Sequence, residues 1–167
     1  VVSELRQLES QFNPHFLFNT LENIKFMIKL DPTTAGKMVV ALSSLLRYSI
    51  NNTVRQVELQ DDLTFLTNYL FIQKERFGKR LDYKDAIATE ALDCLVPKLL
   101  LQPVVENAIK YGADDEGKIT IRAKIQVDQK YLQVEITDAG QGIQPEQLKK
   151  LQQLLQQEAN NSVHTGI

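Results

Sequence analysis

The sequence predicts an α+β protein in which helices come first and strands follow. Apolar residues recur at helical three-and-four spacing as far as Gly78, a helix stop signal. Beyond this glycine, the stretches 118–127 and 131–137 alternate apolar and polar residues, as half-buried strands do. A helical region followed by a mixed region indicates two domains, over residues 1–78 and 79–167.

The first helix is expected over Ser3–Leu30, ending at the turn signal Asp31-Pro32. Its apolar stripe changes face at Pro14, which donates no backbone N–H and disfavours helical backbone at the residue before it. We therefore expect a bend beside His15, which lies with Asn19 on the side away from the downstream stripe. This stripe consists of Leu17, Leu21, Ile24 and Ile28. The alternative is that the proline only starts a helix and the histidine is an ordinary surface residue.

Two more helices complete the predicted N-terminal region. One should be capped by Thr33 or Thr34 and continue to about Ile50. The other should run from Leu59 to Phe77. Because a hairpin of two helices cannot bury both of its apolar faces, we expect the first two helices to dimerise into a bundle. The apolar face of the second helix comprises Met38, Leu42, Leu45 and Leu46.

The mixed region should begin with a strand at Leu81–Ala88 and a helix at Pro97–Tyr111, which Gly112 would end. The two alternating stretches then form a hairpin. A glycine loop at Asp138–Gly142 follows, and Pro145 should start a last helix rich in glutamine and leucine.

Composition excludes several classes of function. A net charge of −2 without a basic cluster gives no reason to expect nucleic acid as a partner. Cys94 is the only cysteine, so neither an internal disulfide nor a thiolate metal cluster is possible. No apolar run approaches the roughly 18 residues that span a bilayer, and no signal peptide is visible.

Two motifs carry chemistry. In QPVVENAIKYG, helical spacing should place Asn107, Lys110 and Tyr111 on one face. The amide oxygen suits Mg²⁺ and the lysine can offset phosphate charge, although a polar surface face would look the same. In the second motif, Asp138 can accept a hydrogen bond from an exocyclic amine, while Gly140 and Gly142 let the backbone approach a ligand.

In their order along the chain, these residues resemble the sensor histidine kinases of the LytS/YehU type, with a GHKL (Bergerat-fold) ATP-binding domain. QFNPHFLFNTL resembles the phosphoacceptor box of this family, QPVVENAIKYG its N box, DAGQG its G1 box and HTGI the start of its G2 box. The pair Arg47-Tyr48 and the segment YLFIQKERF at Tyr69–Phe77 also resemble family signatures. The resemblance covers nearly the whole chain and implies an α/β sandwich after the helices.

The resemblance also implies roles for individual residues. His15 would be the autophosphorylated residue and would pass its phosphoryl group to an aspartate on the receiver domain of a response regulator. Asn107 would coordinate Mg²⁺ on ATP, Lys110 would offset phosphate charge, and Asp138 would read the adenine amino group. The remaining ATP-binding positions would be Tyr111, Gly140 and Gly142 beside the lid loop, and Gly166 near the phosphates.

Two positions depart from the pattern of many histidine kinases. Phe16 stands where an acidic residue often orients the histidine, which leaves Glu22 and Glu106 as candidates for that task. Pro103 replaces an additional N-box asparagine. One helical turn after the histidine, Asn19 could position a water for dephosphorylation, or could have only a structural role.

The leading interpretation is the cytoplasmic portion of a membrane-anchored bacterial sensor kinase. It would act as a homodimer, with an upstream sensor or transmembrane region and with its last glycine box truncated. A second interpretation is a non-catalytic dimeric scaffold whose ATP-binding domain is degenerate. A third is an ATPase of the GHKL class, which would need an acid where Pro103 stands.

Overall fold

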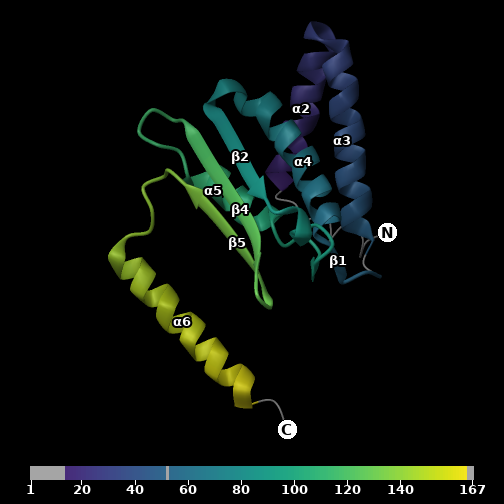
Figure 1. Cartoon of the computed structure of the whole chain (residues 1–167). Coiled ribbons are helices and arrows are strands. Elements are labelled where there is room, and N and C mark those ends of the chain that lie inside the picture. Colours follow the sequence, from purple (N-terminus) through teal and green to yellow (C-terminus); the bar gives the residue numbers. More distant parts are fainter. Residues whose placement is uncertain (1–13, 52, 165–167) are drawn as a thin grey trace.

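Three helices lie side by side in the N-terminal part of the molecule (Figure 1). The computed structural model describes residues 14–51 and 53–164. The three helices are α2 (Pro14–Leu30), α3 (Pro32–Ile50) and α4 (Leu59–Phe77). The expected ends of all three are confirmed, as is the start of α4.

The turn between α2 and α3 is built by Asp31. Its Oδ1 accepts a hydrogen bond from the backbone N–H of Thr34 at 3.1 Å, and α3 begins at Pro32. The expected cap at Thr33 or Thr34 was therefore wrong, because the Asp31 carboxylate already accepts from a free N–H group of the first turn and proline suits the first helical position. The helical turns expected before Pro14, and the bend there, lie outside the described residues.

The buried face of α2 differs from the expected apolar stripe. Phe16, Thr20 and Ile24 are buried, at the four-residue spacing of one helical face. Of the expected stripe, Ile24 is buried and Leu17 is partly buried, whereas Leu21 and Ile28 remain 55% and 57% exposed. The stripe therefore overlaps the buried face only in part, and half of it is uncovered in the single chain.

Two short strands join the helical region to the mixed region. Strand β1 (Gln56–Glu58) pairs in antiparallel fashion with β3 (Leu95–Pro97). Neither strand was predicted from the sequence, since three residues are too few to show alternation. Their pairing ties the segment before α4 to the segment that leads into α5.

Helix α5 spans Gln102–Tyr111 and is shorter than expected. The predicted start at Pro97 was wrong, because Leu99 has a left-handed backbone with φ of 61°, which a helix does not accept. Asp62 of α4 holds this turn by accepting hydrogen bonds from the backbone N–H groups of Leu99 at 2.7 Å and Leu101 at 3.1 Å.

A three-stranded sheet forms the C-terminal part, in the order β2-β4-β5. Strand β2 (Leu81–Ile87) is parallel to β4 (Ile119–Asp128), which is antiparallel to β5 (Tyr131–Asp138). The predicted hairpin is confirmed, and Gln129 in its tight turn has a φ of 51°. The alternation expected for this stretch holds over most of β4, where Ile119, Ile121, Ala123 and Ile125 are buried, but Val127 near its end is 38% exposed.

Two short 3-10 helices link these elements, η1 (Gly78–Arg80) between α4 and β2, and η2 (Thr89–Ala91) after β2. The last helix, α6 (Pro145–His164), starts at the expected proline and extends away from the sheet (Figure 1). The predicted α+β order is thus confirmed. Within the described residues, no helix combines the length and apolar character that a membrane crossing requires.

Candidate functional site

Helix α5 is a wall shared by two cavities. The first, here called the Asp138 cavity, has a volume of about 540 Å³ and is lined by Asn107 and Tyr111 of this helix. The second, the His15 cavity, has a volume of about 400 Å³ and is lined by Glu106 and Lys110. Because an α-helix turns about 100° per residue, adjacent positions on one helix can serve two different sites.

The Asp138 cavity brings together four of the residues expected in an ATP site. Asn107 and Tyr111 come from α5, Asp138 from the end of β5, and Gly142 from the loop that follows. Apolar groups supply most of the remaining lining: Val104, Ala108, Ile136, Ile143 and Leu151. A mainly apolar cleft with a few convergent polar groups is typical of a small-molecule site.

Asp138 is oriented by its own turn. Its Oδ1 accepts a hydrogen bond from the backbone N–H of Gly140 at 2.9 Å, an arrangement common for aspartate in tight turns. A carboxylate has acceptor capacity on both oxygens, so this bond leaves the side chain able to accept from a ligand amine.

Gly140 and Gly112 are required by close packing. A Cβ atom on Gly140 would lie 2.7 Å from both the Cα of Gly112 and the carbonyl oxygen of Tyr111. A Cβ on Gly112 would lie 2.3 Å from the carbonyl oxygen of Ala108. These glycines therefore let the loop after β5 lie directly against the end of α5. Gly142 is different, since its φ of 70° is in the left-handed region.

Lys110 does not line the same cavity as Asn107 and Tyr111. It lines the His15 cavity, whereas Asn107 and Tyr111 line the Asp138 cavity. The joint role of all three residues at one site stays a prediction. Asn107 and Lys110 are about 60° apart around an ideal helix, enough to divide them between two sides of the wall. Lys110 stays near the first cavity, with its Nζ 4.9 Å from the ring centre of Tyr111.

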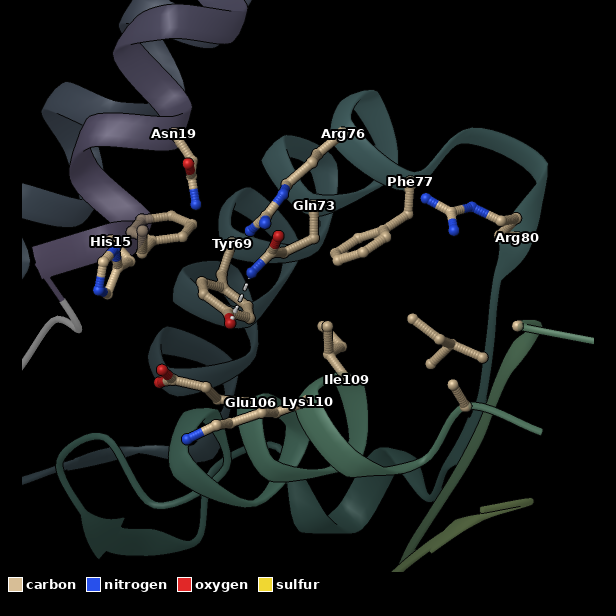
Figure 2. Close-up of a pocket in the computed structure, with 14 residues that line it drawn as sticks. His15, Asn19, Tyr69, Gln73, Arg76, Phe77, Arg80, Glu106, Ile109 and Lys110 are labelled. Carbon is tan, nitrogen blue, oxygen red and sulfur yellow. Dashed lines mark hydrogen bonds between the residues drawn. The ribbon is translucent and has the colours of Figure 1, made fainter. Parts of the chain in front are cut away.

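The His15 cavity lies where α2, α4 and α5 meet (Figure 2). His15 is exposed at the start of α2, and Asn19 is half-buried one turn further along. Figure 2 shows the Asn19 and Arg76 side chains directed into the space between α2 and α4, with Glu106 and Lys110 entering from α5. Further lining comes from Tyr69, Gln73, Phe77 and Arg80.

Phe16 holds His15 at this cavity. Its ring packs against that of Tyr69 of α4, with the ring centroids 5.1 Å apart. Both side chains are buried, and burial raises the pKa of the Tyr69 hydroxyl. The residue that departs from the usual acidic pattern thus anchors the helix that carries the histidine.

The structure separates the two acidic candidates for orienting His15. Glu106 lines the His15 cavity, whereas Glu22 is exposed on α2 and is not part of the lining. Gln102 donates from its Nε2 to Oε2 of Glu106 at 2.6 Å. Glu106 is therefore held in place by its own helix, one turn from Gln102.

The role of the YLFIQKERF segment in this cavity was not predicted from the sequence. The segment was identified only as resembling a family signature, and Gln73 was not singled out. The available signal was the four-residue spacing of Tyr69, Gln73 and Phe77, which places them on one helical face. Gly166, expected near the phosphates, lies outside the described residues.

Magnesium would need ligands beyond the protein. Among the described residues, no three His, Cys, Asp or Glu side chains form a group that could hold a metal ion. The amide oxygen of Asn107 is a suitable hard ligand, and Mg²⁺ usually takes one or two protein oxygens together with substrate phosphates and waters. The residues present therefore fit an ion that enters with a nucleotide.

Comparisons with known proteins cover both parts of the chain. Residues 3–81 match the family model described as histidine kinase, and residues 95–167 match that of the histidine kinase-, DNA gyrase B-, and HSP90-like ATPases. The chain is 38% identical over 167 residues to an uncharacterized sensor-like histidine kinase of Staphylococcus epidermidis, covering 98% of this chain and 32% of that protein. It is 35% identical over 164 residues to the sensor protein kinase HptS of Staphylococcus aureus, with the same coverage. The chain thus spans less than half the length of these relatives.

Proposed function

This chain belongs to the histidine kinase family, and on that premise we propose that it is the catalytic portion of a two-component sensor kinase. It transfers the terminal phosphoryl group of ATP to His15 and then to an aspartate on a response regulator. The observation that carries the proposal is the shared wall, since α5 contributes residues both to a nucleotide-sized cleft and to the cavity that contains the histidine.

ATP would bind in the Asp138 cavity. The apolar lining accepts the adenine ring, and Asp138 accepts a hydrogen bond from the adenine amino group. Lys110, beside Tyr111 on the other side of the wall, offsets charge at the phosphate end. Gly142 and its neighbours form the start of the loop that covers the nucleotide.

Asn107 would hold Mg²⁺ through its amide oxygen. When bound there, the ion would supply positive charge that offsets the phosphate charge, which is most of what phosphoryl transfer requires besides positioning. The chain's own contribution is to place this oxygen on α5, in the lining of the cavity that also contains Asp138.

The transfer step is a displacement at the terminal phosphorus of ATP. A lone pair on a neutral ring nitrogen of His15 forms the N–P bond while the bond from phosphorus to the bridging oxygen breaks, and ADP leaves with that electron pair. The proton on the imidazole passes to an acceptor, for which Glu106 is placed in the same cavity. The phosphoryl group then moves from the nitrogen to an aspartate oxygen of the receiver domain.

The exposed apolar side chains of α2 and α3 would form the dimer interface. Leu21 and Ile28 on α2 and Val39 and Ile50 on α3 are large apolar side chains at least 44% exposed. Large exposed apolar patches mark interaction surfaces. A second copy packed against these helices would complete a helix bundle. The expectation that the whole protein is a membrane-anchored sensor remains a prediction.

Incubation with Mg²⁺ and ATP labelled with ³²P on its terminal phosphate tests this function. We expect acid-labile, alkali-stable label on the chain, or on a longer chain that continues past Ile167, and none on the His15→Gln variant. An Asp138→Asn variant should lose both label and nucleotide binding. Nucleotide binding without any label in either chain would favour the dimeric scaffold instead.

A further inference from the structure

The His15 cavity contains a set of groups that phosphoryl transfer to the histidine does not use. Arg76 and Arg80 line it together with Lys110, and Glu106 is the only carboxylate among its described lining residues. The cavity therefore carries an excess of positive charge. This balance suits a small, doubly charged anion.

Gln73 supplies the second observation. Its side chain is only 5% exposed and lines the cavity. Its Nε2 donates to the hydroxyl oxygen of Tyr69 at 2.8 Å, while its Oε1 is buried and has no hydrogen-bond partner among the described residues. Buried polar groups in native proteins are nearly always paired, so an amide oxygen left without a partner beside a cavity indicates a ligand.

The Gln73 amide can serve either a donor or an acceptor. Rotation by 180° about its last bond exchanges the oxygen and the nitrogen, and the Tyr69 hydroxyl can then donate to the amide oxygen. After this rotation, the NH₂ group faces the cavity and can donate to an anionic oxygen. The pair thus remains bonded in both arrangements.

The arginines are positioned by an aromatic ring. The guanidinium carbon of Arg76 lies 4.9 Å and that of Arg80 lies 5.6 Å from the ring centre of Phe77. Within the described part of the chain, neither guanidinium is paired with a carboxylate. A guanidinium held against a ring keeps its N–H groups available for an oxyanion.

We infer that Gln73 and Arg76, assisted by Arg80, form the seat for the phosphoryl group that His15 carries. The inference rests on the proposed function and assigns it a further pair of residues, which hold the product after transfer. Asn19, one turn from the histidine in the same cavity, faces the seat from α2 (Figure 2). In this seat, one phosphoryl oxygen would accept a hydrogen bond from the Gln73 NH₂ group after the amide has rotated. Other phosphoryl oxygens would bind the Arg76 guanidinium.

Chemical phosphorylation separates this seat from the kinase activity. Phosphoramidate transfers a phosphoryl group to exposed imidazole without ATP, so the His15-labelled chain can be made even if the proposed kinase activity fails. We would follow its ³¹P resonance against pH. A nearby cation favours the dianion, so the Arg76→Gln variant should titrate at a pH about half a unit to one unit higher than the unmodified sequence.

Lys74→Gln is the matched control, because Lys74 is exposed on the same helix and is not part of the cavity lining. It should titrate like the unmodified sequence. Equal pKa values of the phosphoryl group on His15 in the Arg76→Gln and Lys74→Gln chains would overturn the proposed seat. So would failure of the folded chain to accept label at His15 when the chain unfolded in urea does accept it. An Arg76-dependent ³¹P signal from free phosphate in the His15→Gln chain would reassign the cavity to inorganic phosphate.

The Gln73 amide gives an independent readout. In a ¹⁵N-labelled chain, its side-chain NH₂ resonances should move when His15 is phosphorylated. Those of Gln126, which is bonded to Gln133 on the distant hairpin, should stay in place. Unchanged Gln73 resonances in a fully phosphorylated chain would exclude it from the seat.

Discussion

The rings of Phe16 and Tyr69 pack 5.1 Å apart at an interplanar angle of 34°, and this contact joins the helix that carries His15 to α4. Two family signatures that are far apart in the sequence thus meet in one aromatic pair. Tyr69 also accepts the hydrogen bond from Gln73, so the same pair positions the amide that faces the His15 cavity.

Truncation of this contact should destabilise the helical region. Phe16 is 6% exposed, and we expect Phe16→Ala to lower the free energy of unfolding by about 3–5 kcal/mol. Urea unfolding followed by circular dichroism measures the change. Tyr131→Ala is the control, since this ring is 78% exposed at the hairpin and its loss should matter by less than about 0.5 kcal/mol. A loss below about 1 kcal/mol for Phe16→Ala would show that the pair contributes little.

The close approach at Gly140 should be essential for nucleotide binding. Gly140→Ala places a Cβ 2.7 Å from backbone atoms of Tyr111 and Gly112, so the loop that orients Asp138 must shift. We expect at least about a tenfold loss of ATP affinity, equivalent to about 1.4 kcal/mol, by calorimetry.

Gly36→Ala is the matched control for Gly140→Ala. A Cβ on Gly36 meets nothing within 4 Å, and the residue lies inside α3. This change should stabilise the chain by about 0.5–1 kcal/mol and leave ATP affinity unchanged. Similar effects of the two substitutions on binding would contradict the packing argument.

Asp62 should link the stability of the α5 turn to pH. Burial raises the pKa of its carboxyl above the ordinary value, although hydrogen bonds from backbone N–H groups of the turn act in the opposite direction. Asp62 therefore keeps its proton to a higher pH in the native state than in the unfolded state, where an aspartate has a pKa of about 3.9. The stabilising contribution of Asp62 is complete below about pH 3.9 and declines as the pH rises through the native pKa.

Urea unfolding of Asp62→Asn between acidic and neutral pH tests this sign. At acidic pH the protonated carboxyl and the amide each offer one carbonyl oxygen to the backbone N–H groups, so the substitution should cost no more than about 1 kcal/mol there. As the pH rises, the unmodified sequence should lose free energy of unfolding relative to the variant. Asp61→Asn, on the neighbouring exposed residue, should show no such trend. A free energy of unfolding that rises relative to that of Asp62→Asn with pH would contradict the burial argument.

The exposed apolar side chains of α2 and α3 predict that the chain forms a dimer. Leu21→Glu should convert a dimer into a monomer, because a carboxylate cannot be buried unpaired at an apolar interface. Sedimentation velocity measures this directly. Leu95→Glu is the control, since this leucine is 66% exposed on β3, outside α2 and α3, and its replacement should leave the dimer intact. A dimer that survives Leu21→Glu would place the interface elsewhere.

The sequence by itself determined the family and most of the elements. The ordered boxes around His15, Asn107 and Asp138 indicated a histidine kinase, and the comparisons confirm this resemblance. Periodicity and local stop signals located α4 and the β4–β5 hairpin, because these depend on residues close together in the chain.

Tertiary structure decided where the elements meet. The start of α5 moved from Pro97 to Gln102 because Asp62, from a different helix, binds the backbone of the turn before it. Lys110 and Asn107 line different cavities because different elements pack on the two sides of α5. The amide oxygen of Gln73, which has no partner among the described residues, likewise comes to lie beside a cavity only when α2, α4 and α5 pack around one space. Local patterns record the preferences of neighbouring residues, whereas burial and hydrogen bonding at a site depend on residues that only folding brings together.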